Sequence, residues 1–398
     1  MDRKKGLLAL GSLALLLSAA FMVSQTTPQK KVDYESLAQK LVTQCAAIRE
    51  GELVFITGGP KDLELMEDIA VNVRKVGGNP ILSVGSDRLS RRLWTDVPEK
   101  YDLQSREPWV KFAGLFSAGI NISYNEDEAL LADISADRLT AVGKADVVIN
   151  EALRKNNYRV VNLGNGLYPT TQLAQRYGLT KDELSRIFWD CVNIDYSELQ
   201  KTCESVKSAF AGGKEVRITN PNGTDLKVRI EGRPVLVSDG VISAEDMTKG
   251  YAACQVYLPA GEVYFAPNAG TAEGKVVVDR DFVEGHEITG MTMVFKAGKL
   301  VSMTAKSGLD RVKAFYDAAG TGKDEFALVD IGVNPKLGEG QGSRILNYVR
   351  AGMIAVGIGN NVWAGGSNNN PFALQMYVPG CTLTVDGKAL IENGKLLR

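Results

Sequence analysis

The run Leu53-Val54-Phe55-Ile56-Thr57-Gly58-Gly59-Pro60 sets the fold class of the N-terminal half. Four apolar residues followed by a glycine pair and a proline are typical of a short buried strand that ends in a tight turn. Apolar residues recur at helical spacing on either side, over residues 34–49 and 63–76, and predict two helices. Strands and helices in alternation imply a parallel sheet that is covered on both faces.

The same alternation continues along the chain. Thr180 and Glu183 have the spacing of a capping box, which predicts a helical stretch that breaks near residues 192–195 and continues to Phe210. The glycine pair at 212–213 ends it. Further strands of the sheet are expected from short apolar runs at residues 80–84, 120–124, 145–149 and 158–163.

The character of the sequence changes after residue 212. Asn220-Pro221-Asn222-Gly223 is a strong hairpin turn between two strand-like runs. Short strands separated by turns predict an α+β domain with much antiparallel sheet. We therefore expect an α/β domain over residues 33–212 and an α+β domain over residues 213–398. The strands expected in the second domain lie at residues 215–219, 225–230, 234–238, 276–278, 288–295 and 300–305.

The N-terminus has the pattern of an export signal. A basic start, residues 2–5, precedes an apolar run from Gly6 to Val23, and small residues stand near the end of that run. We expect residues 1–24 to be a signal peptide or an N-terminal anchor and residues 25–32 to be a linker. The protein is therefore expected to be exported: periplasmic, extracellular or membrane-anchored. Contact with a membrane is expected only through an uncleaved N-terminal segment, because no later run is long enough to cross a bilayer.

Composition limits the chemistry that the chain can perform. A formal net charge of -1 gives no electrostatic case for binding nucleic acid. His286 is the one histidine, and its flanking sequence reads as the start of an exposed strand, so we interpret it as a surface residue. The five cysteines form no CxxC pair, which excludes zinc-ribbon and thioredoxin-like sites. We interpret most of them as small buried hydrophobic residues.

The second half also carries a set of short motifs, of which Leu258-Pro259-Ala260-Gly261-Glu262-Val263-Tyr264-Phe265-Ala266-Pro267 is the most informative. Here the sequence resembles the aminopeptidase T family, the "thermophilic" metallo-aminopeptidases, whose second half contains an LP-x-GEV-x-x-AP segment. The likeness extends over the mature chain from about Tyr34. Other matching elements are Asn222–Leu226 with Gly232–Pro234, Ala272–Gly274, Ile331–Pro335, Ile354–Gly357 and Gly365–Asn368.

The resemblance implies a two-domain fold and a metal-dependent aminopeptidase. Two divalent metals would activate a water and polarise the carbonyl of the first peptide bond, and they would be held by two Glu, two His and one Asp. One ligand position is retained, at Glu262. The other four positions carry residues that lack a carboxylate or imidazole: Leu328, Met353, Ala373 and Gln375. The position of the family's general base falls in Leu346-Asn347-Tyr348.

Three hypotheses for function follow from this departure. The first is an exported homologue without catalysis that binds a peptide or a small ligand in the old cleft. The second is an active aminopeptidase with an altered, oxygen-ligand metal site around Glu262, where Asp330 is a possible substitute ligand. The third is a different enzyme that uses a free cysteine. No cofactor is certain, although the resemblance makes a divalent metal (Mg, Ca, Co or Zn) conceivable. Asn334 and Asn368 are expected to line the cleft, and the resemblance implies a homodimer.

Overall fold

The computed structural model describes residues 32–337, 348 and 350–397. The expected signal segment, residues 1–24, and all but Val32 of the expected linker therefore lie outside the described residues. Apart from Val32, the described residues belong to one compact unit. Within them, no helix combines the length and the apolar character that crossing a bilayer would need.

A parallel sheet forms the first layer. Its order is β2-β1-β3-β4-β8, and all four strand pairs are parallel. This confirms the strands expected near residues 53, 80, 120 and 158. The strands are β1 (Leu53–Gly58), β2 (Asn79–Val84), β3 (Ala118–Ile122), β4 (Arg159–Leu163) and β8 (Gln255–Leu258).

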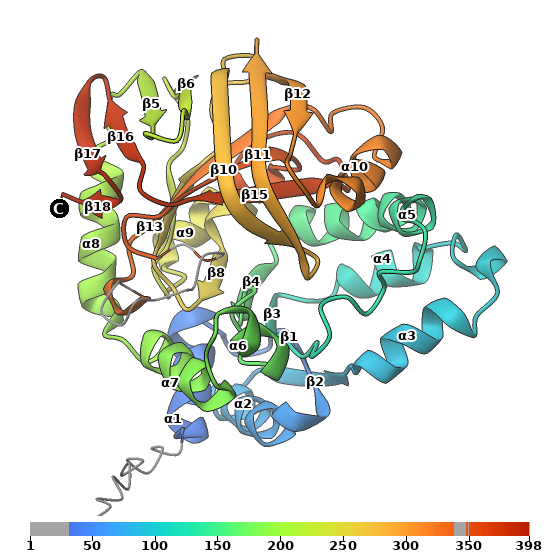
Figure 1. Cartoon of the computed structure of the whole chain (residues 1–398). Coiled ribbons are helices and arrows are strands. Elements are labelled where there is room, and N and C mark those ends of the chain that lie inside the picture. The colour runs from blue at the N-terminus through green and yellow to red at the C-terminus, as the bar shows by residue number, and fades with distance from the viewer. Residues whose placement is uncertain (1–31, 338–347, 349, 398) are drawn as a thin grey trace, which may run out of the picture. The chain divides into compact units, whose positions relative to one another are not determined.

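Helices cover both faces of the parallel sheet. On one side, α1 (Tyr34–Lys40) packs on α2 (Leu63–Lys75), which lies against β1 and β2 (Figure 1). On the other side, Phe55 and Val160 pack with Phe112 of α4 (Glu107–Ala113) and Leu153 of α5 (Ala136–Lys155). The helix expected over residues 34–49 is shorter than predicted, because α1 gives way to a π-helical turn at Leu41–Cys45.

The strand expected at residues 145–149 is wrong, because these residues lie in the middle of α5. Ser135 caps this helix by accepting a hydrogen bond from the backbone N–H of Arg138 at 3.3 Å. The helix then packs against α4 and against α10 (Leu309–Ala318). Tertiary contacts along 20 residues thus override the β-propensity of the Val-Val-Ile run.

The capping box is confirmed. The Thr180 hydroxyl accepts from the Glu183 N–H at 3.2 Å, and the Glu183 carboxylate accepts from the Thr180 N–H at 2.7 Å. The expected break separates α7 (Lys181–Val192) from α8 (Tyr196–Ser208). Residue 212, after which the domain boundary is expected, lies between α8 and β5. The strand β8, which comes later in the sequence than residue 212, is nevertheless the last strand of the parallel sheet.

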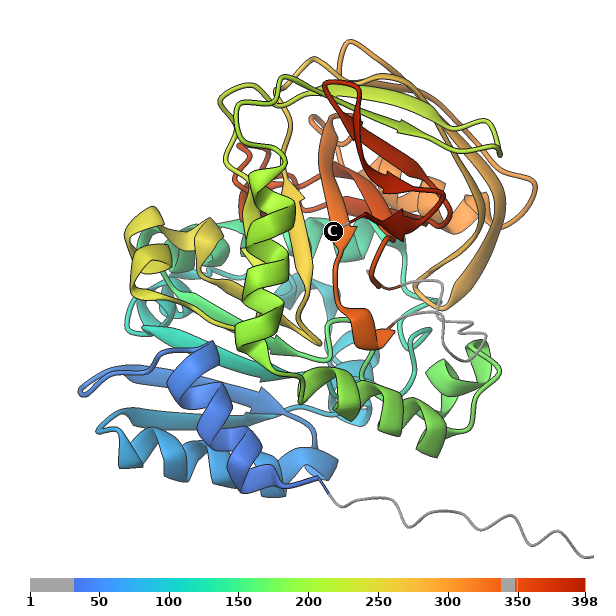
Figure 2. The same cartoon turned by 90° about the vertical axis from the view of Figure 1, so that its left-hand side faces the viewer.

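Antiparallel sheets form the rest of the described chain, and Figures 1 and 2 show their orange and red strands on the far side from the blue helices. The larger sheet has the order β12-β11-β10-β6-β5-β16-β17-β18. The predicted hairpin is confirmed, since β5 and β6 pair from Glu215–Arg229 to Thr219–Asp225. The strands are β5 (Glu215–Thr219), β6 (Asp225–Arg229), β10 (Glu273–Val283), β11 (His286–Lys296), β12 (Lys299–Thr304), β16 (Thr382–Val385), β17 (Lys388–Glu392) and β18 (Lys395–Leu396).

A second antiparallel sheet lies at the centre and carries the candidate site. Its order is β15-β14-β13-β9-β7, and β9, β13 and β14 are buried along their whole length. The short helices α3 (Asp87–Thr95), α6 (Thr171–Arg176) and α9 (Ala244–Lys249) complete the regular structure. The strands are β7 (Leu236–Ser238), β9 (Glu262–Phe265), β13 (Phe326–Gly332), β14 (Ile354–Gly359) and β15 (Ala373–Val378).

Candidate functional site: a buried acidic pocket

One face of the central sheet collects every position that the sequence singled out as a ligand or former ligand. Glu262 pairs with Gly332, so Asp330 and Leu328, two and four residues earlier on β13, lie on the same face as Glu262. Leu328 pairs with Gly357 of β14, which pairs with Gln375 of β15. By the same alternation, Met353 and Ala373 also lie on this face. The strand register therefore places these positions on one face of the central sheet.

A tight loop places Glu262 at the start of β9. Gly261 has φ +125°, and a side chain there would meet the backbone nitrogen of Asn334 at 2.8 Å. The Gly261 N–H donates to the Ser238 carbonyl at 2.8 Å, and the Gly261 carbonyl accepts from the Val333 N–H at 2.8 Å. Asn334, fully buried, donates its side-chain N–H to the Ala260 carbonyl at 2.6 Å. Only glycine combines this φ with such a close approach.

Glu262 and Asp330 face a common cavity of about 260 Å³, which we call the acidic pocket. Both carboxyl side chains are almost fully buried, at 3% and 2% exposed. Among the residues that the structure describes, no lysine or arginine lines the pocket. These residues are Asn165, Tyr257, Glu262, Asp330, Trp363, Gln375 and Tyr377.

Two side-chain amides donate to the carboxylates. Gln375 Nε2 donates to Asp330 Oδ2 at 3.2 Å, and Asn165 Nδ2 lies 3.5 Å from Glu262 Oε1. Among the described residues, Asp330 Oδ1 is buried and has no hydrogen-bond partner. A buried acceptor without a partner costs about 1–3 kcal/mol. One carboxylate oxygen of the acid pair is therefore buried without a hydrogen-bond partner among the described residues.

Burial governs the ionisation of this pair. Loss of solvent raises the pKa of Glu262 well above its usual range, and the neighbouring Asp330 carboxylate raises it further. Burial also raises the pKa of Asp330 to about 7, although the hydrogen bond from Gln375 acts in the opposite direction. The negative charge of either carboxylate thus disfavours ionisation of the other, and a positive charge nearby would reverse this effect.

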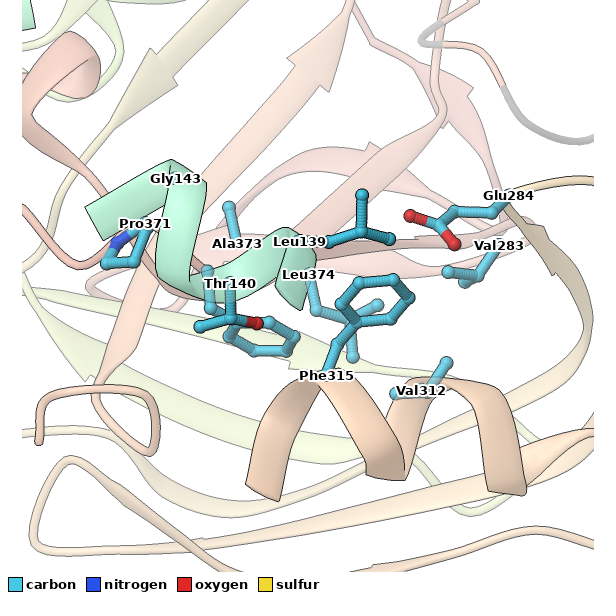
Figure 3. A pocket seen from close by; sticks show the side chains of 11 residues that line it. Leu139, Thr140, Gly143, Val283, Glu284, Val312, Phe315, Pro371, Ala373 and Leu374 are labelled. Carbon is cyan, nitrogen blue, oxygen red and sulfur yellow. The ribbon is translucent and has the colours of Figure 1, made fainter. Parts of the chain in front are cut away.

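The four former ligand positions differ in their surroundings. Leu328 belongs to a buried apolar cluster with Tyr264, Ala266, Ala327 and Ala364. Met353 packs with Ala355 and Tyr377. Ala373 lines a separate, largely apolar pocket between α5 and α10 (Figure 3). Only Gln375 still faces the acidic pocket.

The remaining predicted residues lie elsewhere. Asn368 lines another pocket, where its side chain donates to the Gly322 carbonyl at 2.7 Å. Asn334, expected to line the cleft, is instead 0% exposed, because its side chain supports the loop before Glu262. His286 begins β11 and is exposed, which confirms its interpretation as a surface residue.

All five cysteines are free and buried. Burial raises the pKa of the Cys45 and Cys191 thiols to about 12 and that of Cys254 and Cys381 to about 11, and it also raises the pKa of Cys203. Such thiols are poor nucleophiles at neutral pH. None lines the acidic pocket, so the geometry gives no support to the hypothesis of a cysteine enzyme.

Sequence reasoning missed four lining residues: Asn165, Tyr257, Trp363 and Tyr377. Asn165 carried a usable signal, since it stands two residues after the end of β4 and ligands gather at the carboxyl ends of parallel strands. The three aromatic residues carried none, because they come from β8, a short turn and β15, which only the fold brings together.

The donor set of the acidic pocket does not fit a two-metal centre. Such a centre needs about five side-chain ligands, mostly carboxylates and imidazoles. The pocket offers two carboxylates, and both nearby amides turn their N–H groups, not their oxygens, toward them. Among the described residues, no group of three or more His, Cys, Asp or Glu side chains is placed to hold a metal ion.

Comparisons with known proteins agree with the fold. A family model described as thermophilic metalloprotease (M29) matches residues 30–333. The solved structure of wild-type AmpT from Thermus thermophilus is similar at a TM-score of 0.69 and 18% identity, covering 92% of this chain and 99% of that one. A 2,5-dihydroxypyridine dioxygenase from Pseudomonas putida KT2440 is similar at a TM-score of 0.57 and 11% identity, covering 92% and 96%. No curated relative matches the sequence.

Proposed function

We propose that this chain, which belongs to the thermophilic metalloprotease family M29, acts as a binding protein rather than a peptidase and holds a cationic amine in the acidic pocket. The amine would be the terminal ammonium group of a peptide or of a small ligand. The observation that carries the proposal is the burial of Glu262 and Asp330 in one pocket, whose lining in the described part of the chain includes no basic side chain.

The electrostatics favour a cation. Two buried carboxyl groups without a counter-charge are costly to ionise, and an ammonium group between them offsets that cost. It would also supply a donor to Asp330 Oδ1, which has no hydrogen-bond partner among the described residues. Tyr257, Trp363 and Tyr377 add aromatic rings around the same cavity, and aromatic faces attract ammonium groups.

The ligand count argues against peptide hydrolysis by the family's two metals. Leu328 and Met353, at two former ligand positions, are packed in apolar surroundings. An imidazole or carboxylate left there without a metal would be an unpaired buried polar group, and apolar residues avoid that cost. The proposal follows from these replacements together with the retained Glu262 and the neighbouring Asp330.

Titration calorimetry with the peptide Ala-Ala-Ala and its N-acetylated form tests the proposal. We expect the free amine to bind and the acetylated peptide to fail, because acetylation removes the positive charge. Glu262→Gln should weaken binding by tenfold or more, since a buried charged contact contributes about 2 kcal/mol or more. Asp239→Asn, a partly buried acid outside the pocket, is the matched control and should bind as the unmodified protein does. Equal binding of both peptides would contradict the proposal.

A second candidate is an aminopeptidase that uses an altered, oxygen-ligand site for a hard cation. Asp330 Oδ1 favours it, because this buried oxygen has no partner among the described residues and carboxylate and amide oxygens suit Mg²⁺ or Ca²⁺. The amides of Asn165 and Gln375 would have to turn over to offer their oxygens. Stoichiometric metal in the purified protein, with Leu-p-nitroanilide hydrolysis that Glu262→Gln abolishes, would establish this candidate and overturn the first.

We also propose export and a homodimer. The basic start and apolar run at residues 1–23 support export, and the family resemblance supports the dimer. N-terminal sequencing of the protein recovered from each cell fraction tests the first. Sedimentation equilibrium of the mature chain tests the second.

A further inference from the structure

A row of polar side chains crosses the parallel sheet. Thr57, Asn121 and Asn162 occupy matching positions on β1, β3 and β4, and the strand register continues the row to Tyr257 on β8. Thr57 Oγ1 donates to Asn121 Oδ1 at 3.0 Å, and Asn121 Nδ2 donates to Asn162 Oδ1 at 3.2 Å. The row ends at the acidic pocket, which Tyr257 lines.

This row lies where open α/β sheets bind ligands. The order β2-β1-β3-β4-β8 reverses direction between β1 and β3, and Thr57 and Asn121 stand at the carboxyl ends of those two strands. Ligands of such sheets occupy the crevice at this switch point. A cavity of about 600 Å³ is present there, within the usual size range of small-molecule sites. We call it the polar crevice, and its lining includes Thr57, Asn121, Asn162, Asn165, Tyr168 and Tyr377.

The charges of the polar crevice are compensated. Its charged lining residues are Glu128, Arg176 and Glu284. Arg176 pairs with Glu128 and also lies over the ring of Phe282, 4.6 Å from its centroid. Glu284 pairs with Arg311 at 3.2 Å. Arg176, the one arginine among the described lining residues, is already paired, so the crevice does not match a phosphate and a nucleotide does not fit.

Hydrogen-bonding capacity remains in the crevice. Asn162 Oδ1 is used by Asn121, whereas Asn162 Nδ2 donates to no described residue and the side chain is partly exposed. Side-chain amide and hydroxyl groups can both donate and accept hydrogen bonds, and so can the hydroxyl groups of a sugar ring. The rings of Tyr168 and Tyr377 supply flat apolar surface beside them.

We propose that the polar crevice binds a neutral, hydroxyl-rich ligand of the carbohydrate class. Its hydroxyls would pair with the Thr57–Asn121–Asn162 row while its ring faces contact the aromatic side chains. A peptide strand fits less well, because β1, β3 and β4 are interior strands and offer no free edge for backbone pairing. This inference is independent of the amine site, although Asn165 and Tyr377 line both cavities.

Titration calorimetry with three neutral disaccharides, maltose, cellobiose and diacetylchitobiose, tests the inference on the whole mature chain. At least one of them should bind. Asn162→Asp keeps the oxygen that Asn121 uses but removes the free donor, and it should weaken binding about tenfold, the value of one lost hydrogen bond. Asn193→Asp, at the exposed end of α7, adds the same charge away from the crevice and should have no effect.

A second variant covers the case in which Asn162→Asp does not fold. Thr57→Val removes the hydroxyl of the row with little change in shape and should also weaken binding. Failure of all three sugars to bind at millimolar concentration would overturn the proposal. The proposal would also be overturned if the protein bound Ala-Ala-Ala but none of the sugars, and if Thr57→Val abolished that peptide binding. If the unmodified chain binds a disaccharide but binds Ala-Ala-Ala and its N-acetylated form equally, only the proposed function is contradicted.

Discussion

Glu262 and Asp330 share one pocket because Glu262 pairs with Gly332, two residues after Asp330 on the same face of β13. The two acids are diagonal neighbours across an antiparallel pair, a geometry that brings long side chains within reach of each other. Because no basic residue lines the pocket in the part of the chain that the structure describes, ionising both acids carries an electrostatic cost. A cationic ligand, as proposed above, would offset that cost.

Replacing one acid should therefore stabilise the free protein. We expect Asp330→Asn to raise the free energy of unfolding at pH 7 by ~1 kcal/mol, because it removes a like charge and a desolvated carboxylate from the pocket. Urea unfolding followed by circular dichroism measures the change. Asp96→Asn makes the same change in net charge at an exposed acid and should not stabilise. A loss of stability in Asp330→Asn would show that the acid pair is satisfied in the free protein.

The loop before Glu262 should tolerate no side chain at Gly261. In Gly261→Ala the new Cβ would stand 2.7 Å from the Cβ of Asn334 at φ +125°, so both the backbone and the contact are strained. We expect a loss of ~3 kcal/mol or more in unfolding free energy, together with loss of amine binding. Gly387→Ala has a positive φ of 82° but open space around it, and it should cost only ~1 kcal/mol. Equal losses in the two variants would contradict the close packing of this loop.

Thiol reactivity distinguishes a buried cysteine set from a catalytic one. We expect none of the five thiols to react with Ellman's reagent in the native protein, because all are buried and burial raises their pKa values. All five should react once the chain is unfolded in guanidinium chloride. A thiol that reacts quickly in the native protein would contradict this expectation and support the hypothesis of a cysteine enzyme.

The sequence predicted secondary structure well where neighbouring residues alone determine it. The Thr180 capping box, the Asn220–Gly223 turn and the first two strands are present where they were expected. The prediction failed at residues 145–149, where a β-branched run lies in the helix α5. Ser135 caps the N-terminus of this helix, and α4 and α10 pack against it. Propensity over five residues cannot compete with packing over a whole helix.

The site could be predicted in part. Alignment to short motifs indicated Glu262 and, through strand alternation, Asp330 as its neighbour. It could not indicate Trp363 or Tyr257, because their place beside Glu262 depends on how a turn and a parallel strand meet the central sheet. It also could not show that Ala373 faces a different pocket from Gln375, two residues away on the same strand face.

Stability should depend on pH through Asp281, which lies on β10 and is 1% exposed. Burial raises the pKa of this carboxyl from 3.8 to about 7, although the N–H groups of Tyr377 and Phe282 donate to it and Arg176 lies nearby. The folded protein therefore holds a proton that the unfolded chain has released, and the free energy of unfolding falls as pH rises from about 4 to about 7.

Asp281→Asn removes this titration and keeps an acceptor oxygen for one of the two backbone N–H groups. Urea unfolding at intervals from pH 4 to pH 8 should show a shallower decline for the variant, by ~1–3 kcal/mol over the window. Asp330 contributes a decline of the same sign, so some slope should remain. Asp133, which pairs with Arg91 and has a pKa lowered to about 2, is the control, because Asp133→Asn should leave the slope above pH 5 unchanged. An unchanged slope in Asp281→Asn would mean that this buried carboxyl is already ionised at pH 5 in the folded protein.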